Sequence, residues 1–193
     1  MDNPKVIDIE KITSARAFGR EYGTFVGIAW ALMFVFFMIS IENGSTMAML
    51  VSLIFAGLCV SLPFTLGYRY RNKSVNNNGL SYKRAYFFSF IMFLYASLLA
   101  GITTFAYFHF FDNGSFGESL KEMIAQAQKE PMPEAWDKML NEETKFVDML
   151  LDGTIKPIEL ALAIFNQSFT MGIVCSLATA AFFKKSPNKE LSN

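Results

Sequence analysis

Four long stretches of the chain have no charged residue in their interior. They cover residues 24–41, 46–68, 85–111 and 158–183, and they contain 18, 23, 27 and 26 residues. An α-helix rises about 1.5 Å per residue and the hydrocarbon layer of a bilayer is about 30 Å thick, so about 20 residues are enough to cross it. The stretches therefore predict an all-α polytopic membrane protein in which four transmembrane helices form one bundle.

A soluble bundle of four buried helices is the alternative to this interpretation. The chain is 52% hydrophobic and 16% aromatic, which a soluble domain could also reach. Helices of a soluble bundle need polar positions at a period of about 3.6 residues to face water. The run Phe-Val-Phe-Phe-Met-Ile at residues 34–39 offers no polar position, so the pattern favours insertion into a membrane.

Charged residues are sorted by sign along the chain, although the net charge is zero. The segments before the first span, between the second and third spans and after the fourth hold twelve Lys and Arg against five carboxylates, a net charge of +7. The turn at residues 42–45 and residues 112–159 hold five Lys against twelve carboxylates, a net charge of −7. Because Lys and Arg in short loops stay on the cytoplasmic side, we expect both termini in the cytoplasm.

The chain divides into a membrane domain with two flanking segments. We expect an amphipathic cytoplasmic lead-in at residues 1–23, the four-span domain at residues 24–183 and a cytoplasmic tail at residues 184–193. Within the domain, the outer segment 112–156 shows two apolar stripes at helical spacing, separated by two prolines. We expect two amphipathic helices there, which lie on the outer membrane surface or cap the bundle. A face for a partner protein is the sharper alternative.

The most polar group inside a span lies in the fourth one, about 12 Å from its start by the helical rise. Its side chains are Asn166, Gln167, Ser168 and Thr170. Amides in hydrocarbon are unfavourable unless they are hydrogen-bonded, so polar residues at this depth raise the expectation of function. Hydrogen bonds between helices explain them more simply. Asn166 and Gln167 are nevertheless candidate binding residues.

Catalytic chemistry has little support in the sequence. No Lys, Arg, Asp or Glu lies near the middle of a span, and no nucleotide, zinc-protease or serine-hydrolase fingerprint is present. His109, the only histidine, ends the third span among aromatic residues, and Glu159 lies in the first turn of the fourth. Both are weak candidate binding residues at the outer rim. We expect no catalytic residue, metal site, cofactor or nucleic-acid partner.

Some local features resemble a known family. They are Tyr22-Gly23 leading into Gly27, the Gly79-Leu80-Ser81-Tyr82 turn followed by Ala85-Tyr86 and a long aromatic span, an acidic outer region and a final span that ends in Lys184-Lys185. Together these resemble the Bacteroidota inner-membrane proteins catalogued as domain of unknown function 4199. One departure is Phe111-Asp112-Asn113-Gly114 after the third span, where that family often has a proline-containing turn.

The resemblance implies a four-span protein in the inner membrane of a Gram-negative bacterium. It implies no activity, because the family has none assigned, and it therefore carries no functional residues over to this chain. With the bilayer as its surroundings, the protein is expected to meet a membrane-protein partner or further copies of itself as a homo-oligomer.

Three functional hypotheses follow from these features. The leading one is a non-enzymatic structural or accessory component of the inner membrane, whose outer helices and basic inner loop contact partners or lipid. The alternative is a small transporter or channel subunit, in which Asn166 and Gln167 line a polar path in an oligomer. The third is a membrane enzyme, which would require Glu159 and His109 to reach a shared pocket.

Overall fold

The computed structural model describes the backbone of residues 4–74, 80–129 and 134–184, and the side chains of residues 13–72, 80–129 and 141–184. The elements in chain order are α1 (Pro4–Asn43), α2 (Thr46–Ser74), α3 (Tyr82–Ala106), the short π-helix η1 (Tyr107–Phe111), α4 (Ser115–Ala127), α5 (Glu134–Leu151) and α6 (Pro157–Phe183). Helices thus make up nearly all of the described residues. The prediction of an all-α fold is confirmed.

Four of the helices are long and apolar enough to cross a membrane. The candidate spans are Thr13–Asn43, Thr46–Asn72, Tyr82–Phe111 and Pro157–Phe183. Large apolar side chains cover the outside of these helices; Val60 of α2, for example, is 67% exposed and Ile54 is 64% exposed. Apolar side chains on the outer surface are stable in lipid and unfavourable in water. The chain is therefore a multi-pass membrane protein, as its four apolar stretches predict.

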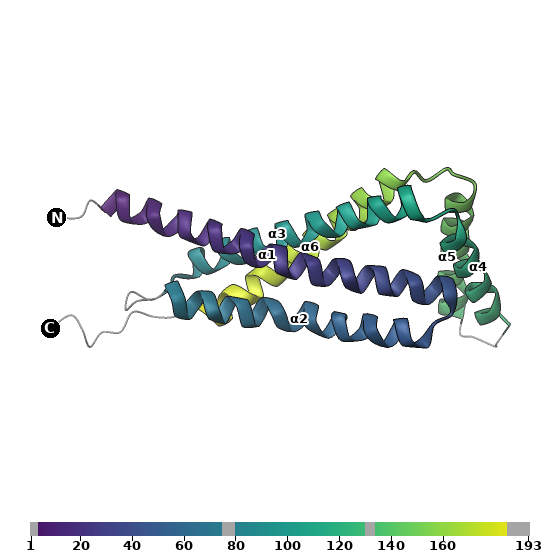
Figure 1. The fold of residues 1–193 in the computed structure, drawn as a ribbon, viewed down its shortest axis with the longest axis horizontal. Helices are drawn as coiled ribbons and strands as arrows, with labels where there is room; N and C mark the ends of the chain where they lie inside the picture. The colour runs from purple at the N-terminus through teal and green to yellow at the C-terminus, as the bar shows by residue number, and fades with distance from the viewer. Residues whose placement is uncertain (1–3, 75–79, 130–133, 185–193) are drawn as a thin grey trace.

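The first helix begins well before the first apolar stretch. The lead-in expected at residues 1–23 is not a separate helix, because α1 runs without a break from Pro4 to Asn43. A helix of 40 residues is about 60 Å long, which is about twice the thickness of the hydrocarbon layer. The N-terminal part of α1 consequently extends beyond the other helices at the end of the bundle where both termini lie (Figure 1).

Helix α3 lies at the centre of the bundle and packs against α1 on one side and α6 on the other. Helix α2 packs mainly against α1 and touches α6 little. Glycines allow the close approaches: an added Cβ at Gly23 of α1 would lie 2.5 Å from the carbonyl oxygen of Met92 in α3, and one at Gly172 of α6 would lie 2.7 Å from Cβ of Phe93. Small residues at helix contacts are typical of membrane bundles.

The largest hydrophobic cluster ties the helices together near the end with the termini. Its buried members include Val26, Tyr70, Phe88, Met92 and Phe183, which come from all four spans. The rings of Tyr70 and Phe88 stack with centroids 4.1 Å apart. This packing fixes α2 against α3 at the end where α2 and α6 also meet.

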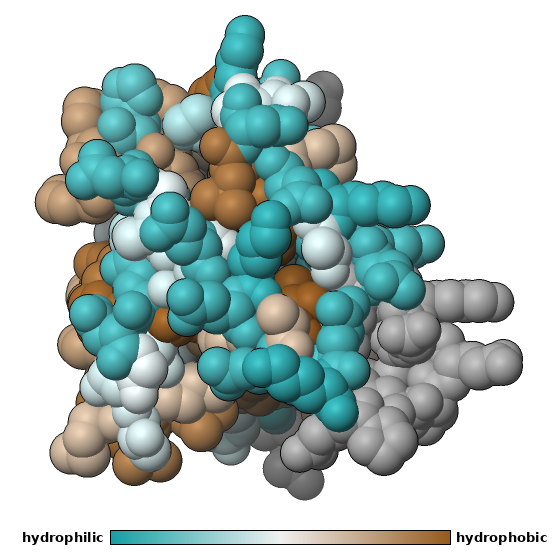
Figure 2. Space-filling view, turned by 90° about the vertical axis from the view of Figure 1, so that its right-hand side faces the viewer, coloured by the Kyte–Doolittle hydropathy of each residue, from teal (hydrophilic) through white to brown (hydrophobic). Residues whose placement is uncertain are grey.

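Helices α4 and α5 lie across the opposite end of the bundle (Figure 1). Gly117 of α4 lets Leu151 of α5 pack close, and the Nζ of Lys121 lies 2.7 Å from Oδ1 of Asp148. A second hydrophobic cluster, with Phe116 buried beside Met38 of α1, holds the pair to the bundle. Seen from this end, the surface is mostly hydrophilic (Figure 2). The two amphipathic helices expected in the outer segment are thus present, and they cap the bundle.

Candidate functional site

The two amides predicted as a polar path lie on the outside of the bundle. Both Asn166 and Gln167 are exposed side chains on α6. The face of α6 that packs on α3 is formed instead by residues such as Gly172, Ser176 and Ala180, which are buried. Neither amide has a hydrogen-bond partner among the described residues. One helix therefore presents two unpaired amides to its surroundings near the middle of a span.

The amides point in different directions from α6. Gln167 lines an apolar cavity of about 540 Å³ between α2 and α6, which we term the α2–α6 groove. Trp30 and Phe93 form its floor, and Val60 and Ala178 lie on its two walls. Asn166 does not line this groove. The structure thus separates two residues that are adjacent in the sequence: Gln167 belongs to a cavity, and Asn166 belongs to the outer face of α6.

Aromatic rings close the groove towards the end with the termini. The ring of Phe183 in α6 covers Gly67 in α2, where an added Cβ would lie 2.1 Å from the ring. Phe64 packs edge-to-face on Phe182 and Phe183, with ring centroids 6.1 and 6.5 Å away. Away from this contact α2 and α6 touch little, and α6 diverges from α2 towards the α4–α5 end (Figure 1).

Glu159 and His109, the two residues considered for catalysis, both make structural contacts. The Glu159 carboxylate accepts a hydrogen bond of 3.0 Å from the backbone N–H of Lys156 and so satisfies a free N–H at the start of α6. His109 is exposed in η1, and its ring stacks on Phe105 with centroids 5.0 Å apart. Neither residue lines the groove or the two other cavities found among the described residues. None of these three cavities brings them together.

A polar cluster that the sequence did not suggest lies where α1, η1 and α4 meet. The Glu42 carboxylate, at the end of α1, accepts hydrogen bonds from the hydroxyl of Tyr107 and from that of Ser115, the latter at 2.7 Å. Asp112 caps the first turn of α4 by accepting a hydrogen bond of 3.2 Å from the N–H of Phe116. We term Glu42, Tyr107, Asp112 and Ser115 the Glu42 cluster.

The π-helix contributes Tyr107 to this cluster. In η1 the N–H of Asp112 bonds to the carbonyl of Tyr107, five residues back, so the turn is wider than an α-helical turn and the following side chains are rotated. The sequence shows only that Glu42 directly follows one apolar stretch and that Tyr107 lies near the end of another. The cluster fixes the position of α4 relative to α1.

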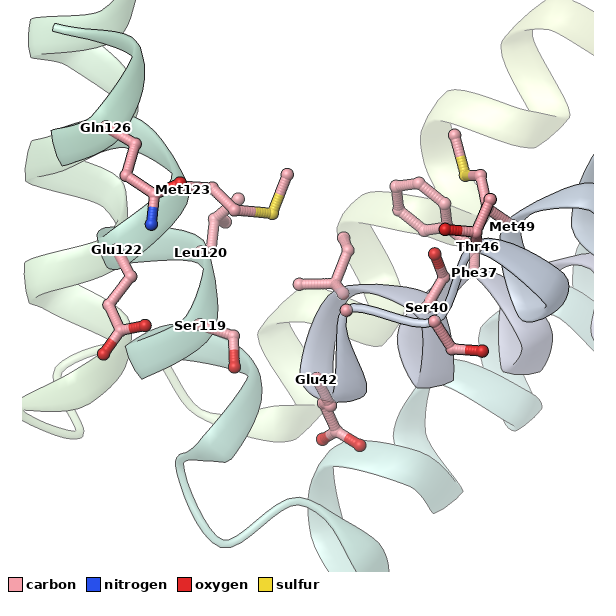
Figure 3. Close-up of a pocket in the computed structure, with 13 residues that line it drawn as sticks. Phe37, Ser40, Glu42, Thr46, Met49, Ser119, Leu120, Glu122, Met123 and Gln126 are labelled. Atoms are coloured by element: carbon pink, nitrogen blue, oxygen red, sulfur yellow. The ribbon is translucent and has the colours of Figure 1, made fainter. Parts of the chain in front are cut away.

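An open cavity of about 660 Å³ lies beside the Glu42 cluster, between the α1–α2 turn and α4. Leu120 and Met123 of α4 point across it towards the turn, and Glu122 and Gln126 line its rim (Figure 3). Its lining combines apolar and polar side chains and lacks a titratable cluster suited to catalysis. Among the residues that the structure describes, no group of three or more His, Cys, Asp or Glu side chains is placed to hold a metal ion.

Comparisons with known proteins identify the family but assign no activity. The family described as "Protein of unknown function (DUF4199)" matches residues 21–185, which is most of the 193-residue chain. Searches of curated proteins and of solved structures returned no significant match. The matched region contains the first candidate span from residue 21 onwards, the other three spans and the α4–α5 pair, in agreement with the resemblance seen in the sequence. The chain belongs to the DUF4199 family.

Proposed function

We propose that the protein is a non-enzymatic structural component of the bacterial inner membrane that associates with a second copy of itself through the outer face of α6. The observation that carries the proposal is the exposed amide of Asn166 near the middle of a membrane span. An amide that faces lipid has no hydrogen-bond partner there, and such a group is unfavourable. A contact that pairs it removes this penalty.

A second copy of the chain fits this face by its chemistry. An Asn side chain carries both a donor and an acceptor, so two Asn166 side chains can pair with each other across a two-fold axis. Thr170 lies one turn after Asn166 on the same face of α6 and is also exposed. The small residue Ala163 lies about one turn before Asn166. A small residue permits close approach, and Asn and Thr form hydrogen bonds between helices in membranes.

The packing of the bundle argues against transport through a single copy. Met92, Phe93 and Ala96 fill the contacts that α3 makes with its neighbours, and all three are buried. The buried hydroxyls of Ser97 and Ser176 donate to carbonyls of their own helices. The transport hypothesis would therefore need a path between copies. Of the two amides, only Gln167 faces the α2–α6 groove, so the two side chains do not line one path within a single copy.

The orientation of the protein forms part of this proposal. Both termini lie at one end of the bundle and the α4–α5 pair lies at the other (Figure 1). The cations Arg69, Arg71 and Lys184 follow the spans at the end with the termini. By the positive-inside rule, the end with the termini faces the cytoplasm. Helices α4 and α5 therefore lie on the opposite side of the inner membrane, away from the cytoplasm.

The test is the oligomeric state of the purified chain in lipid discs, measured by mass photometry. We expect a dimer for the natural sequence, a monomer for Asn166→Leu and a dimer for Gln167→Leu, which makes the same change on the neighbouring residue away from the proposed contact. A dimer that survives Asn166→Leu, or a natural chain that is monomeric, would contradict the proposed contact. Ion flux in liposomes that is lost in the Asn166→Leu/Gln167→Leu double variant would favour a conducting oligomer instead.

A further inference from the structure

We propose that the α2–α6 groove binds one acyl chain of an anionic phospholipid from the leaflet on the side of the termini. The groove is lined almost entirely by apolar side chains and opens between two membrane-spanning helices. Its opening therefore faces hydrocarbon, which favours an acyl chain over any water-soluble ligand. This site is on a different side of α6 from the Asn166 face, so the inference goes beyond the proposed function.

The groove is about as long as the hydrocarbon layer of one leaflet is thick, and it lies near the bilayer centre. On α6 its lining runs from Gln167 to Thr179, and on α2 it runs from Ala56 to Phe64. Twelve helical steps correspond to about 18 Å, close to half of a hydrocarbon layer about 30 Å thick. On α6 this stretch runs from near the middle of the helix towards the end with the termini, and on α2 it is centred on the middle of the helix. An acyl chain that enters from the membrane surface on the side of the termini would thus lie in the groove near the bilayer centre.

Cationic side chains lie at the membrane surface beyond the closed end of the groove, one on each helix. Arg71 follows Gly67 by four residues on α2 and so lies on the side of α2 that meets Phe183. Its guanidinium carbon lies 5.5 Å from the centroid of the Tyr68 ring. Lys184 directly follows Phe183 and is exposed. Two cations at this membrane surface complement a negatively charged headgroup whose acyl chain reaches the groove from its side open to lipid.

This charge distinguishes a lipid from the other apolar occupant, a helix of a second copy. An α2 or α6 helix of a second copy would end in cations of its own at this surface and would supply no anion to Arg71 and Lys184. An anionic phospholipid instead places a phosphate beside these cations and a flexible chain against Trp30 and Phe93. Each juxtamembrane cation is expected to favour an anionic lipid about fivefold over a zwitterionic one.

Trp30 on the groove floor provides a direct test. We would reconstitute the full chain, with Trp136→Phe so that Trp30 is the one remaining tryptophan, into vesicles containing phosphatidylglycerol or phosphatidylcholine with brominated acyl chains. Bromine quenches tryptophan fluorescence only on close contact. We expect stronger quenching of Trp30 by the brominated phosphatidylglycerol than by the phosphatidylcholine at equal mole fraction. Equal quenching by the two lipids would overturn the headgroup part of the proposal.

Variants separate the groove from the rest of the surface. Ala178→Phe and Val60→Phe fill the groove from opposite walls and should each abolish the preference for the brominated phosphatidylglycerol. Ala181→Phe, the same change one turn along α6 outside the groove lining, should leave it intact. Arg71→Gln should lower the preference about fivefold, whereas Arg69→Gln should not. If the brominated lipids quench Trp30 in both groove-filling variants as they do in the natural chain, no acyl chain occupies the groove. If neither brominated lipid quenches Trp30 in the natural chain, a protein segment and not a lipid fills the groove.

The preference for the anionic lipid should not depend on self-association. Asn166→Leu should leave the lipid preference unchanged, even where it converts a dimer into a monomer. Loss of the preference in Asn166→Leu would show that the groove forms only in the oligomer, and it would contradict a site built by α2 and α6 of one chain. Failure of the dimer with retention of lipid selectivity would reject the proposed function and keep this inference.

Discussion

The carbonyl oxygen of Met92 in α3 approaches Gly23 of α1 so closely that a Cβ on residue 23 would lie 2.5 Å from it. The Cβ of Tyr95 would lie 2.9 Å away. Because one of these neighbours is a backbone atom of another helix, no rotamer change can relieve the contact. The glycine therefore sets the distance between the two helices that make the most extensive contact with each other.

Gly23→Ala should destabilise the bundle. The added methyl group forces α1 and α3 apart, and overpacking of this kind typically costs about 1–3 kcal/mol. The gain in helix propensity from Gly to Ala, about 1 kcal/mol, offsets part of the loss. Unfolding in mixed micelles, followed by circular dichroism against the mole fraction of a denaturing detergent, measures the difference in free energy.

Gly57→Ala on α2 is the matched control for that experiment. An added Cβ at Gly57 meets no atom within 4 Å, so only the gain in helix propensity remains. The two identical substitutions should shift the midpoint of unfolding in opposite directions. A shift of the same sign and size in both variants would show that α1 and α3 do not approach as the structure describes.

The Glu42 cluster should hold the outer end of the bundle through the hydrogen bond from Tyr107 to Glu42. A double-mutant cycle with Glu42→Gln and Tyr107→Phe should give a coupling energy of about 1 kcal/mol in the free energy of unfolding. Tyr82→Phe is the control, since the Tyr82 hydroxyl donates to the carbonyl of Leu177 at the other end of the bundle. Glu42→Gln and Tyr82→Phe should be additive. Additivity in the Tyr107 cycle as well would argue against the cluster.

The turn between α5 and α6 should have a measurable dependence on pH. The side chain of Thr154 and then its backbone N–H, which donates to Oδ1 at 2.9 Å, lower the pKa of Asp152 from its ordinary value. Since the folded-state pKa is lowered, the stabilisation of the turn is fully present above the ordinary pKa of aspartate. It is lost as the pH falls through the lowered value.

An NMR titration of the Asp152 carboxyl carbon in micelles checks this prediction. The natural chain should titrate below an unstructured aspartate, Thr154→Ala should move the midpoint upwards, and Thr154→Ser should largely retain the shift because the hydroxyl remains. An ordinary titration of Asp152 in the natural chain would mean that the turn does not form these hydrogen bonds.

The sequence predicted the four spans and the two outer helices because each rests on a one-dimensional pattern. Apolar length identifies a span, and the stripes at Leu120 and Ile124 or at Val147 and Leu150 identify amphipathic helices. The partner of each small residue was not predictable in the same way. The spacing of Gly23 and Gly27 would equally suit a contact between two copies, and the structure shows them against α3 of the same chain. Spacing shows that a face is small without identifying its neighbour.

The candidate site was predictable only in part. Sequence singled out Asn166 and Gln167 as polar residues at membrane depth, and their rotation relative to α3 required the structure. The groove depends on the divergence of α6 from α2 beyond the contact of Phe183 with Gly67 (Figure 1). The Glu42 cluster joins residues 65 and 73 positions apart, and no local pattern records such a contact.

The most direct test of the account is the sidedness of the two ends of the bundle. In a chain with Cys59 and Cys175 replaced by Ala, single cysteines at Ala125→Cys in α4 and at Lys184→Cys after α6 would be exposed to a membrane-impermeant maleimide in intact spheroplasts. The account predicts labelling of the α4 position from outside and labelling of position 184 only after the membrane is broken. Labelling of position 184 in intact spheroplasts with α4 protected, or release of the chain from membranes without detergent, would contradict it.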